Sequence, residues 1–186
     1  ADVPTSGDLD VTTLGPLIAD IMPEESIVSD ESATSSLIVT PHALQAKPHD
    51  WLALTGGSIG QGLPLAIGAS IAKPDRPVIT LHGDGGAMYT VQALWTQARE
   101  NLNITNIIFS NRSYEILKIE LDRVQAVETG ERAASMFSMD NPPIDWVNLA
   151  ESMGVQGYKP KTVKEFKDVF SKSINESGPS LIEIEI

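Results

Sequence analysis

The segment from Val78 to Asn111 places the strongest constraint on the fold. Val78 to Leu81 is a short β-branched apolar run between a proline and a glycine-rich turn, which indicates a buried strand. Met88 to Glu100 carries apolar residues at helical spacing, and Asn106 to Ser110 indicates a second buried strand. A strand, helix and strand in this order predict parallel pairing and a right-handed crossover.

The rest of the chain extends the same alternation. Further helices are predicted at Leu14 to Ile21, Leu63 to Ala72, Asp145 to Met153 and Val163 to Ile174. Further strands are predicted at Ser26 to Glu31 and, with alternating polarity, at Leu181 to Ile186. Residues 1–10 are expected to be a loose lead-in, Leu44 to Leu54 a loop, and Thr34 to Val39 is ambiguous. The prediction is one α/β domain over residues 1–186, with a mainly parallel sheet and helices on both faces.

Charge and composition exclude several classes of function. The 13 basic residues face 25 acidic ones, for a net charge of −12, so neither nucleic acid nor an anionic membrane surface is an expected partner. A bound phosphate must therefore be held by backbone N–H groups, hydroxyls and a metal ion. The absence of cysteine excludes disulfides, thiolate metal sites and a cysteine nucleophile, and fits a cytoplasmic location.

The start of the chain and its apolar segments carry two further expectations. No apolar stretch approaches the roughly 18 residues of a membrane span. The N-terminus lacks the basic and apolar segments of a signal peptide. It also lacks an initiator methionine, which suggests a fragment or a processed product.

Two oxygen-bearing side chains follow neighbouring strands of the predicted unit. Asp84 comes after the first strand and Asn111 after the second. Ligands of open parallel sheets bind beyond the carboxyl ends of the strands, and a carboxylate with an amide oxygen suits Mg²⁺. Gly83, Gly85 and Gly86 let the backbone approach phosphates at the start of a helix. The alternative is a tight turn in which Asp84 only caps the helix.

Beside Gly83-Asp84-Gly85 and the later Asn111, four segments follow a familiar order: Asp30 to Ser35, Gly56 to Ala69, Tyr89 to Ala98 and Ser110 to Tyr114. Together they resemble the thiamine diphosphate (ThDP) enzymes of the acetolactate synthase, benzoylformate decarboxylase and pyruvate decarboxylase superfamily. The last is similar to that family's Asn-Asn-x-x-Tyr, with Ser110 in place of the first Asn. The likeness implies the C-terminal, diphosphate-binding domain of such an enzyme.

The resemblance implies a role for individual residues. Asp84, Asn111 and the carbonyl of Ser113 would bind Mg²⁺. Ile59 would wedge between the two rings of ThDP and hold the cofactor in a V shape, and the Gly57 carbonyl would accept a hydrogen bond from its amino group. The residues assigned to the cofactor are Thr34, Gly57, Ser58, Ile59, Gly83, Gly85, Gly86 and Tyr114. Ala33 departs from family members that have a hydroxyl at that position.

Other side chains receive ordinary structural interpretations. His82 is expected to be structural, because family catalytic histidines come from segments outside this chain; His42 and His49 are treated with the same caution. Trp95 is expected in the core. Glu115, Glu120 and Asp122 are expected on a solvated helix. An apolar wall facing substrate is predicted from Phe109, Ile116, Leu117 and Ile119.

The resemblance also implies what lies outside this chain. No catalytic residue is expected here, because the family's glutamate at the cofactor N1′ sits on a pyrimidine-binding domain of the same or a partner subunit. The leading hypothesis is part of an acetolactate synthase-like 2-keto acid decarboxylase or carboligase, homo-oligomeric when complete, with FAD undecided. Three alternatives stay open: the diphosphate-binding subunit of a split sulfopyruvate- or phosphonopyruvate-type decarboxylase, a non-catalytic ThDP-binding module, and an unrelated nucleotide-binding domain.

Overall fold

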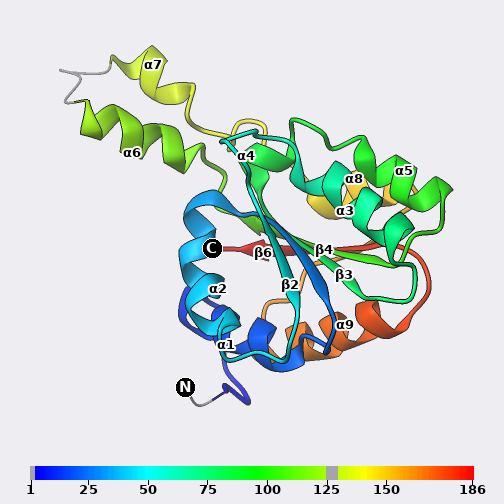
Figure 1. Ribbon diagram of the computed structural model, residues 1–186. Helices are drawn as coiled ribbons and strands as arrows, with labels where there is room; N and C mark the ends of the chain where they lie inside the picture. Colours follow the sequence, from blue (N-terminus) through cyan, green and yellow to red (C-terminus); the bar gives the residue numbers. More distant parts are fainter. Residues whose placement is uncertain (1–2, 125–129) are drawn as a thin grey trace.

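The computed structural model describes residues 3–124 and 130–186 of the protein (Figure 1). Within these residues, six strands form one sheet in the order β2-β1-β3-β4-β6-β5, and the neighbouring strands pair in parallel. The strands are β1 (Ile27–Glu31), β2 (Asp50–Ala53), β3 (Val78–Gly83), β4 (Ile104–Ser110), β5 (Gln156–Tyr158) and β6 (Ser180–Glu185). The predicted α/β class is confirmed.

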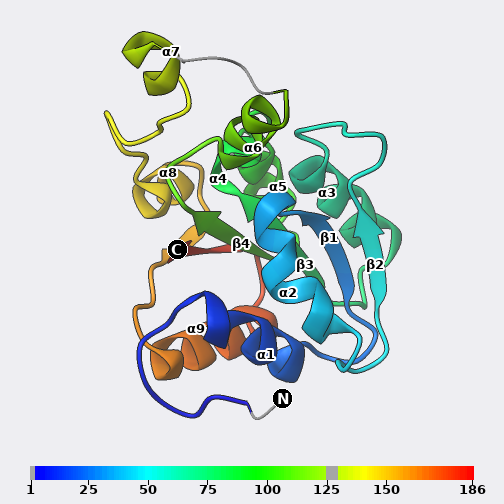
Figure 2. The ribbon, with the colours of Figure 1, turned by 90° about the vertical axis from the view of Figure 1, so that its left-hand side faces the viewer.

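Helices cover both faces of the sheet (Figures 1 and 2). One face carries α1 (Val11–Ile21), α2 (Ser36–Ala43) and α9 (Val163–Asn175), and the other carries α3 (Gly62–Ala72), α5 (Ala93–Arg99) and α8 (Trp146–Ser152). The short helices η1 (Ala33–Ser35) and α4 (Asp84–Ala87) follow β1 and β3, whereas α6 (Glu115–Arg123) and α7 (Glu131–Ser135) extend from the body.

Two apolar layers hold the helices to the sheet. Side chains alternate along a strand, so Ile107 and Phe109 of β4 pack in the layer of α1 and α9, while Ile108 packs in the layer of α3, α5 and α8. Each fully buried Leu, Ile or Phe side chain stabilises the fold by roughly 1.5–3 kcal/mol. These layers fix β3 and β4 side by side, and thereby fix the two turns that follow them.

The segment before α1 is tied to the body, so the expected loose lead-in is wrong for residues 7–10. The Leu9 N–H donates to the Lys161 carbonyl at 3.0 Å, and the Val163 N–H donates to the Gly7 carbonyl at 3.0 Å. The Asp10 carboxylate caps α1 through the N–H groups of Thr12 and Thr13. Residues 1–2 of the predicted lead-in lie outside the described residues.

Three further expectations need correction. The predicted loop from Leu44 to Leu54 contains β2, an edge strand whose four residues are all at least partly exposed and therefore lack an apolar run. The helix predicted from Met88 begins only at Ala93. Trp95 is 53% exposed and lies under the Arg99 guanidinium, because Gln97 takes the buried position on that helix and bonds Asn106.

Strand β6 is buried on both faces, although its alternating sequence is typical of a half-exposed strand. Its Glu183 is 1% exposed, and the Lys159 ammonium lies 3.3 Å from the Glu183 carboxylate. Burial raises the pKa of Glu183, and the nearby Lys159 opposes that rise.

In the part of the chain that the structure describes, no helix is long and apolar enough to span a membrane.

Candidate functional site

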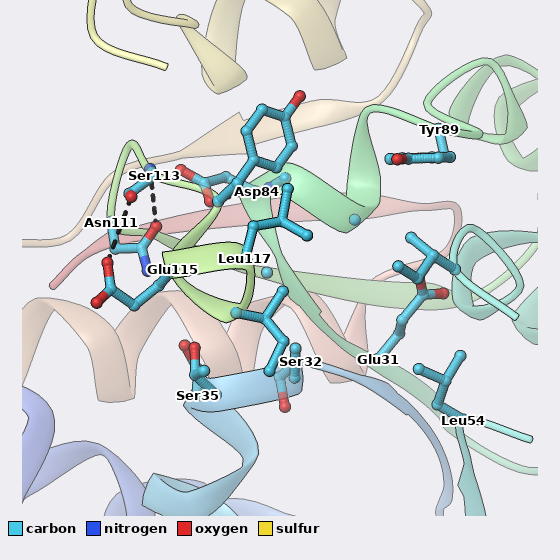
Figure 3. A pocket seen from close by; sticks show the side chains of 18 residues that line it. Glu31, Ser32, Ser35, Leu54, Asp84, Tyr89, Asn111, Ser113, Glu115 and Leu117 are labelled. Carbon is cyan, nitrogen blue, oxygen red and sulfur yellow. Dashed lines mark hydrogen bonds between the residues drawn. The ribbon is translucent and has the colours of Figure 1, made fainter. Parts of the chain in front are cut away.

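A hollow lies at the carboxyl ends of β1, β3 and β4 (Figure 3). The parallel register sets these ends level, with Glu31 opposite His82 and Gly83 opposite Phe109. Most of the residues predicted from sequence line this hollow: Thr34, Ile59, Gly83, Asp84, Gly85, Gly86, Asn111, Ser113 and Tyr114. Gly57 and Ser58 lie in the turn beside Ile59.

Asp84 begins α4 directly after β3 and is only 3% exposed. Its Oδ1 accepts the Gly85 N–H at 2.9 Å, and its Oδ2 accepts the Arg112 N–H at 2.7 Å. Burial raises the pKa of Asp84, while these backbone hydrogen bonds oppose the rise. The bond to Arg112 joins the turn after β3 to the turn after β4.

Asn111 stands at the start of the second turn. Its Oδ1 accepts the Ser113 N–H at 2.9 Å, which folds the turn over the end of β4 (Figure 3). Arg112 adopts a left-handed conformation, with φ of +53°, and its guanidinium pairs with Asp140 and Glu185. The turn is therefore held through its backbone and through the Arg112 side chain, and Arg112 is not among the residues that line the hollow.

The donor set of these two turns fits a hard divalent cation. Asp84 and Asn111 both line the hollow, and each side-chain oxygen that accepts a backbone N–H retains a second lone pair. Carboxylate, amide and carbonyl oxygens are the ligands that Mg²⁺ takes, commonly together with phosphate oxygens.

The glycines after β3 let neighbouring side chains pack directly against the backbone that lines the hollow. A Cβ at Gly85 would lie 2.7 Å from Cδ1 of Tyr114, and a Cβ at Gly86 would lie 3.1 Å from Oε1 of Glu31. Only glycine allows this approach of backbone and ring. The turn after β3 therefore has no side chain of its own between its glycine backbone and the hollow.

The loop after β1 forms the opposite wall. Thr34 lies in η1, next to Ala33, whose φ of +50° is unusual for a residue with a Cβ. Oδ1 of Asp30 accepts hydrogen bonds from both the N–H and the hydroxyl of Ser32. Asp30 thus holds the loop after β1 through Ser32, and Thr34 of that loop lines the hollow.

Glu31 is a site residue that sequence reasoning missed. It is 3% exposed, lines the hollow, and accepts the backbone N–H groups of Gly60 and Gly62. His82 lies beside it, fully buried, with its Nε2 3.3 Å from the Glu31 carboxylate. Burial lowers the pKa of His82 to about 4, so its ring is neutral near pH 7. A strand ending in Ser-x-Glu beneath a glycine-rich turn was the available signal.

The apolar wall differs from the predicted one. Ile116 and Leu117 line the hollow, together with Leu54 and Tyr89. Phe109 is 1% exposed and packs in the core, because it alternates onto the α1 and α9 side of β4, so its predicted place in the wall is wrong. Ile119 lies outside the lining residues. Of the three acids predicted on a solvated helix, Glu115 lines the hollow, while Glu120 and Asp122 lie farther along α6.

Comparisons with a family model and with known proteins point to the same group of enzymes. Residues 33–184 match the family "Thiamine pyrophosphate enzyme, C-terminal TPP binding domain". A Mycobacterium tuberculosis protein named, provisionally, acetolactate synthase large subunit IlvX is 44% identical over 96% of this chain and 35% of its own length. The benzoylformate decarboxylase of Pseudomonas aeruginosa is 27% identical over 96% of this chain and 32% of its own length.

A solved structure has the same fold over the whole of this chain. The ThDP-dependent 4-hydroxybenzoylformate decarboxylase of Rhodococcus jostii RHA1 superposes with a TM-score of 0.82 and 30% identity, over 100% of this chain and 34% of that one. The chain thus spans about a third of the length of each of these relatives.

Proposed function

The chain belongs to the thiamine pyrophosphate enzymes, through their C-terminal TPP binding domain, and on that premise we propose that its hollow holds the diphosphate of ThDP through Mg²⁺. The observation that carries the proposal is the meeting of Asp84 and Asn111, from the ends of neighbouring strands, at one hollow. Asp84, Asn111 and the Ser113 carbonyl would bind the metal.

The remaining walls would orient the cofactor. The Gly86 N–H would donate to the diphosphate, Gly83 and Gly85 would let the backbone approach it, and Thr34 and Tyr114 would border it. Ile59 is 47% exposed at the hollow, which supports a role as the wedge between the two rings. The Gly57 carbonyl, which already accepts the Ile59 N–H at 2.9 Å, has a second lone pair for the cofactor's amino group. Ser58 would support this turn.

We propose that the complete protein decarboxylates or ligates 2-keto acids, as an acetolactate synthase-like enzyme. ThDP, when bound, supplies the stabilisation of the carbanion left by loss of CO₂. This chain binds and orients the cofactor and forms an apolar side of the hollow with Ile116 and Leu117. The catalytic glutamate would come from a pyrimidine-binding domain of the same or a partner subunit, in a homo-oligomer. A cytoplasmic location, and one domain over residues 1–186, stay predictions.

A calorimetric titration tests the cofactor site. ThDP is titrated into the chain, up to millimolar concentrations, with and without Mg²⁺. We expect metal-dependent binding that Asp84→Ala weakens roughly tenfold or more, since loss of a metal-site group typically weakens affinity by that order. Asp168→Ala, which removes an exposed charge from α9, is the matched control and should bind as the wild type does.

Other results would contradict the proposed site or the proposed activity. ThDP binding that ignores Mg²⁺ and Asp84, or binding of a nucleotide in place of ThDP, would contradict the proposed site. The proposed activity fails separately if the complete enzyme, loaded with ThDP and Mg²⁺, releases CO₂ from no 2-keto acid.

A further inference from the structure

Glu31 places a carboxylate beneath the turn that carries Ile59. Strand β1 presents Ser29 and Glu31 on one face, two residues apart. One oxygen of Glu31 accepts the Gly60 N–H, and the other accepts the Gly62 N–H at 2.6 Å. These two backbone amides give the buried carboxylate the hydrogen bonds that it needs away from water.

The same two glycines are also held through their carbonyl groups. The Thr90 hydroxyl donates to the Gly60 carbonyl at 2.7 Å, and the Ser29 hydroxyl donates to the Gly62 carbonyl at 2.9 Å. Gly60 is therefore bonded on both sides of its α-carbon, from β1 through Glu31 and from the far side through Thr90.

The turn at Gly60 and Gly62 is also packed tightly against neighbouring side chains. Gly60 has a φ of +96°, and a Cβ there would lie 2.9 Å from the Cβ of Tyr89. A Cβ at Gly62 would lie 2.6 Å from Nε2 of His82. The backbone thus rests directly on its neighbours on either side of the Glu31 carboxylate. Ile59, one residue before Gly60, is left half-exposed at the hollow.

We propose that Glu31 is a positioning residue that fixes Ile59 against the rings of the bound cofactor, by holding the amides of Gly60 and Gly62. This rests on the proposed function, because the ligand of Ile59 is ThDP. Glu31 acts through the turn, because each of its two oxygens already accepts an amide of that turn. Its effect should therefore fall on recognition of the two rings and spare recognition of the diphosphate.

The first test examines the turn itself, without any ligand. Glu31→Gln replaces one acceptor oxygen with an NH₂ group that cannot accept an amide hydrogen. We expect the Gly60 and Gly62 amides to exchange with solvent at least roughly tenfold faster by NMR, the effect of losing a hydrogen bond to a charged group. The matched control is Glu183→Gln, which makes the same change at a buried glutamate of β6 and should leave both amides unaltered.

The second test separates ring recognition from diphosphate recognition. Affinities for ThDP and for inorganic diphosphate are measured calorimetrically, both with Mg²⁺. Glu31→Gln should weaken ThDP binding on the order of tenfold and leave diphosphate binding unchanged, because only the rings meet Ile59. Thr90→Val, which removes the hydroxyl from the other side of Gly60, should show the same pattern with a smaller loss, and it keeps the test available if Glu31→Gln folds poorly.

A double-mutant cycle tests whether Glu31 acts through Ile59. Ile59→Ala alone should weaken ThDP binding and spare diphosphate. Adding Glu31→Gln to it should then have little further effect, because two residues that act through one contact are not additive. Additive losses, equal losses for both ligands, or an unchanged Glu31→Gln protein would each overturn the proposal. A wild-type chain that binds neither ligand would instead overturn the proposed function, and the amide exchange rates would still decide whether Glu31 holds the turn.

Discussion

The ring of Tyr114 lies directly over Gly85, so closely that a methyl group on Gly85 would sit 2.7 Å from Cδ1 of the ring and 2.9 Å from Cε1. These residues come from the two turns that follow β3 and β4. Their contact therefore sets the spacing between the loop after Gly83 and the loop of Asn111, on which the proposed diphosphate site depends.

Gly85→Ala should separate these two turns. We expect ThDP affinity in the presence of Mg²⁺ to fall at least roughly tenfold, because a tightly packed ring and backbone must shift by tenths of an ångström or more. Calorimetry with the chain measures this. The control is Gly68→Ala in α3, where a Cβ meets no atom within 4 Å and should stabilise the helix by about 0.5–1 kcal/mol without affecting the ligand. Equal affinities of both variants would show that the spacing is not critical.

Ala33→Gly should stabilise the protein. Ala33 has a φ of +50°, a left-handed conformation that disfavours a side chain, so glycine should raise the free energy of unfolding by about 0.5–1 kcal/mol. Chemical denaturation checks the change. Ala69→Gly, inside α3, makes the same substitution in helical backbone and should lower that free energy by about the same amount. A loss of stability in both variants would argue against strain at Ala33.

Glu183→Gln should change how stability depends on pH. Burial raises the folded-state pKa of Glu183 above its ordinary 4.5, so its contribution to stability is fully present below pH 4.5 and is lost as pH rises through the folded-state pKa. Glutamine does not titrate. The free energy of unfolding of the variant, relative to wild type, should therefore be most favourable near pH 7 and decline as pH falls toward 4.5. Urea denaturation across this range measures it, and a difference that is constant with pH, or grows as pH falls, would refute the assignment.

The central unit of the fold was predictable because its signals are local. The apolar strands β3 and β4, with a glycine turn between strand and helix, indicate parallel pairing without any distant information. That pairing alone predicts that Asp84 and Asn111 meet. Strand β2 could not be found this way, since Asp50 and Ala53 are exposed edge positions with no apolar pattern.

The remaining errors came from contacts that a local pattern does not contain. Trp95 does not occupy the buried face of α5, because Gln97 does so and forms hydrogen bonds with Asn106, nine residues away on β4. Phe109 was predicted in an apolar wall, whereas the alternation of β4 turns it toward α9. Glu31 was visible as part of an acidic segment, but its partners Gly60 and Gly62 lie 29 and 31 residues away and emerge only in the fold.

The strand order has a consequence for how the protein folds. Strand β1 pairs with β3 through Ile27 and Val78, and β4 pairs with β6 through Thr105 and Ser180, so both ladders join parts of the chain that are distant in sequence. Chains dominated by such non-local pairings fold slowly, because loop closure is unfavourable before the contacts form. The hollow draws its walls from β1, β3 and β4 together. The complete hollow therefore requires that the β1–β3 ladder has formed as well as the β3–β4 ladder.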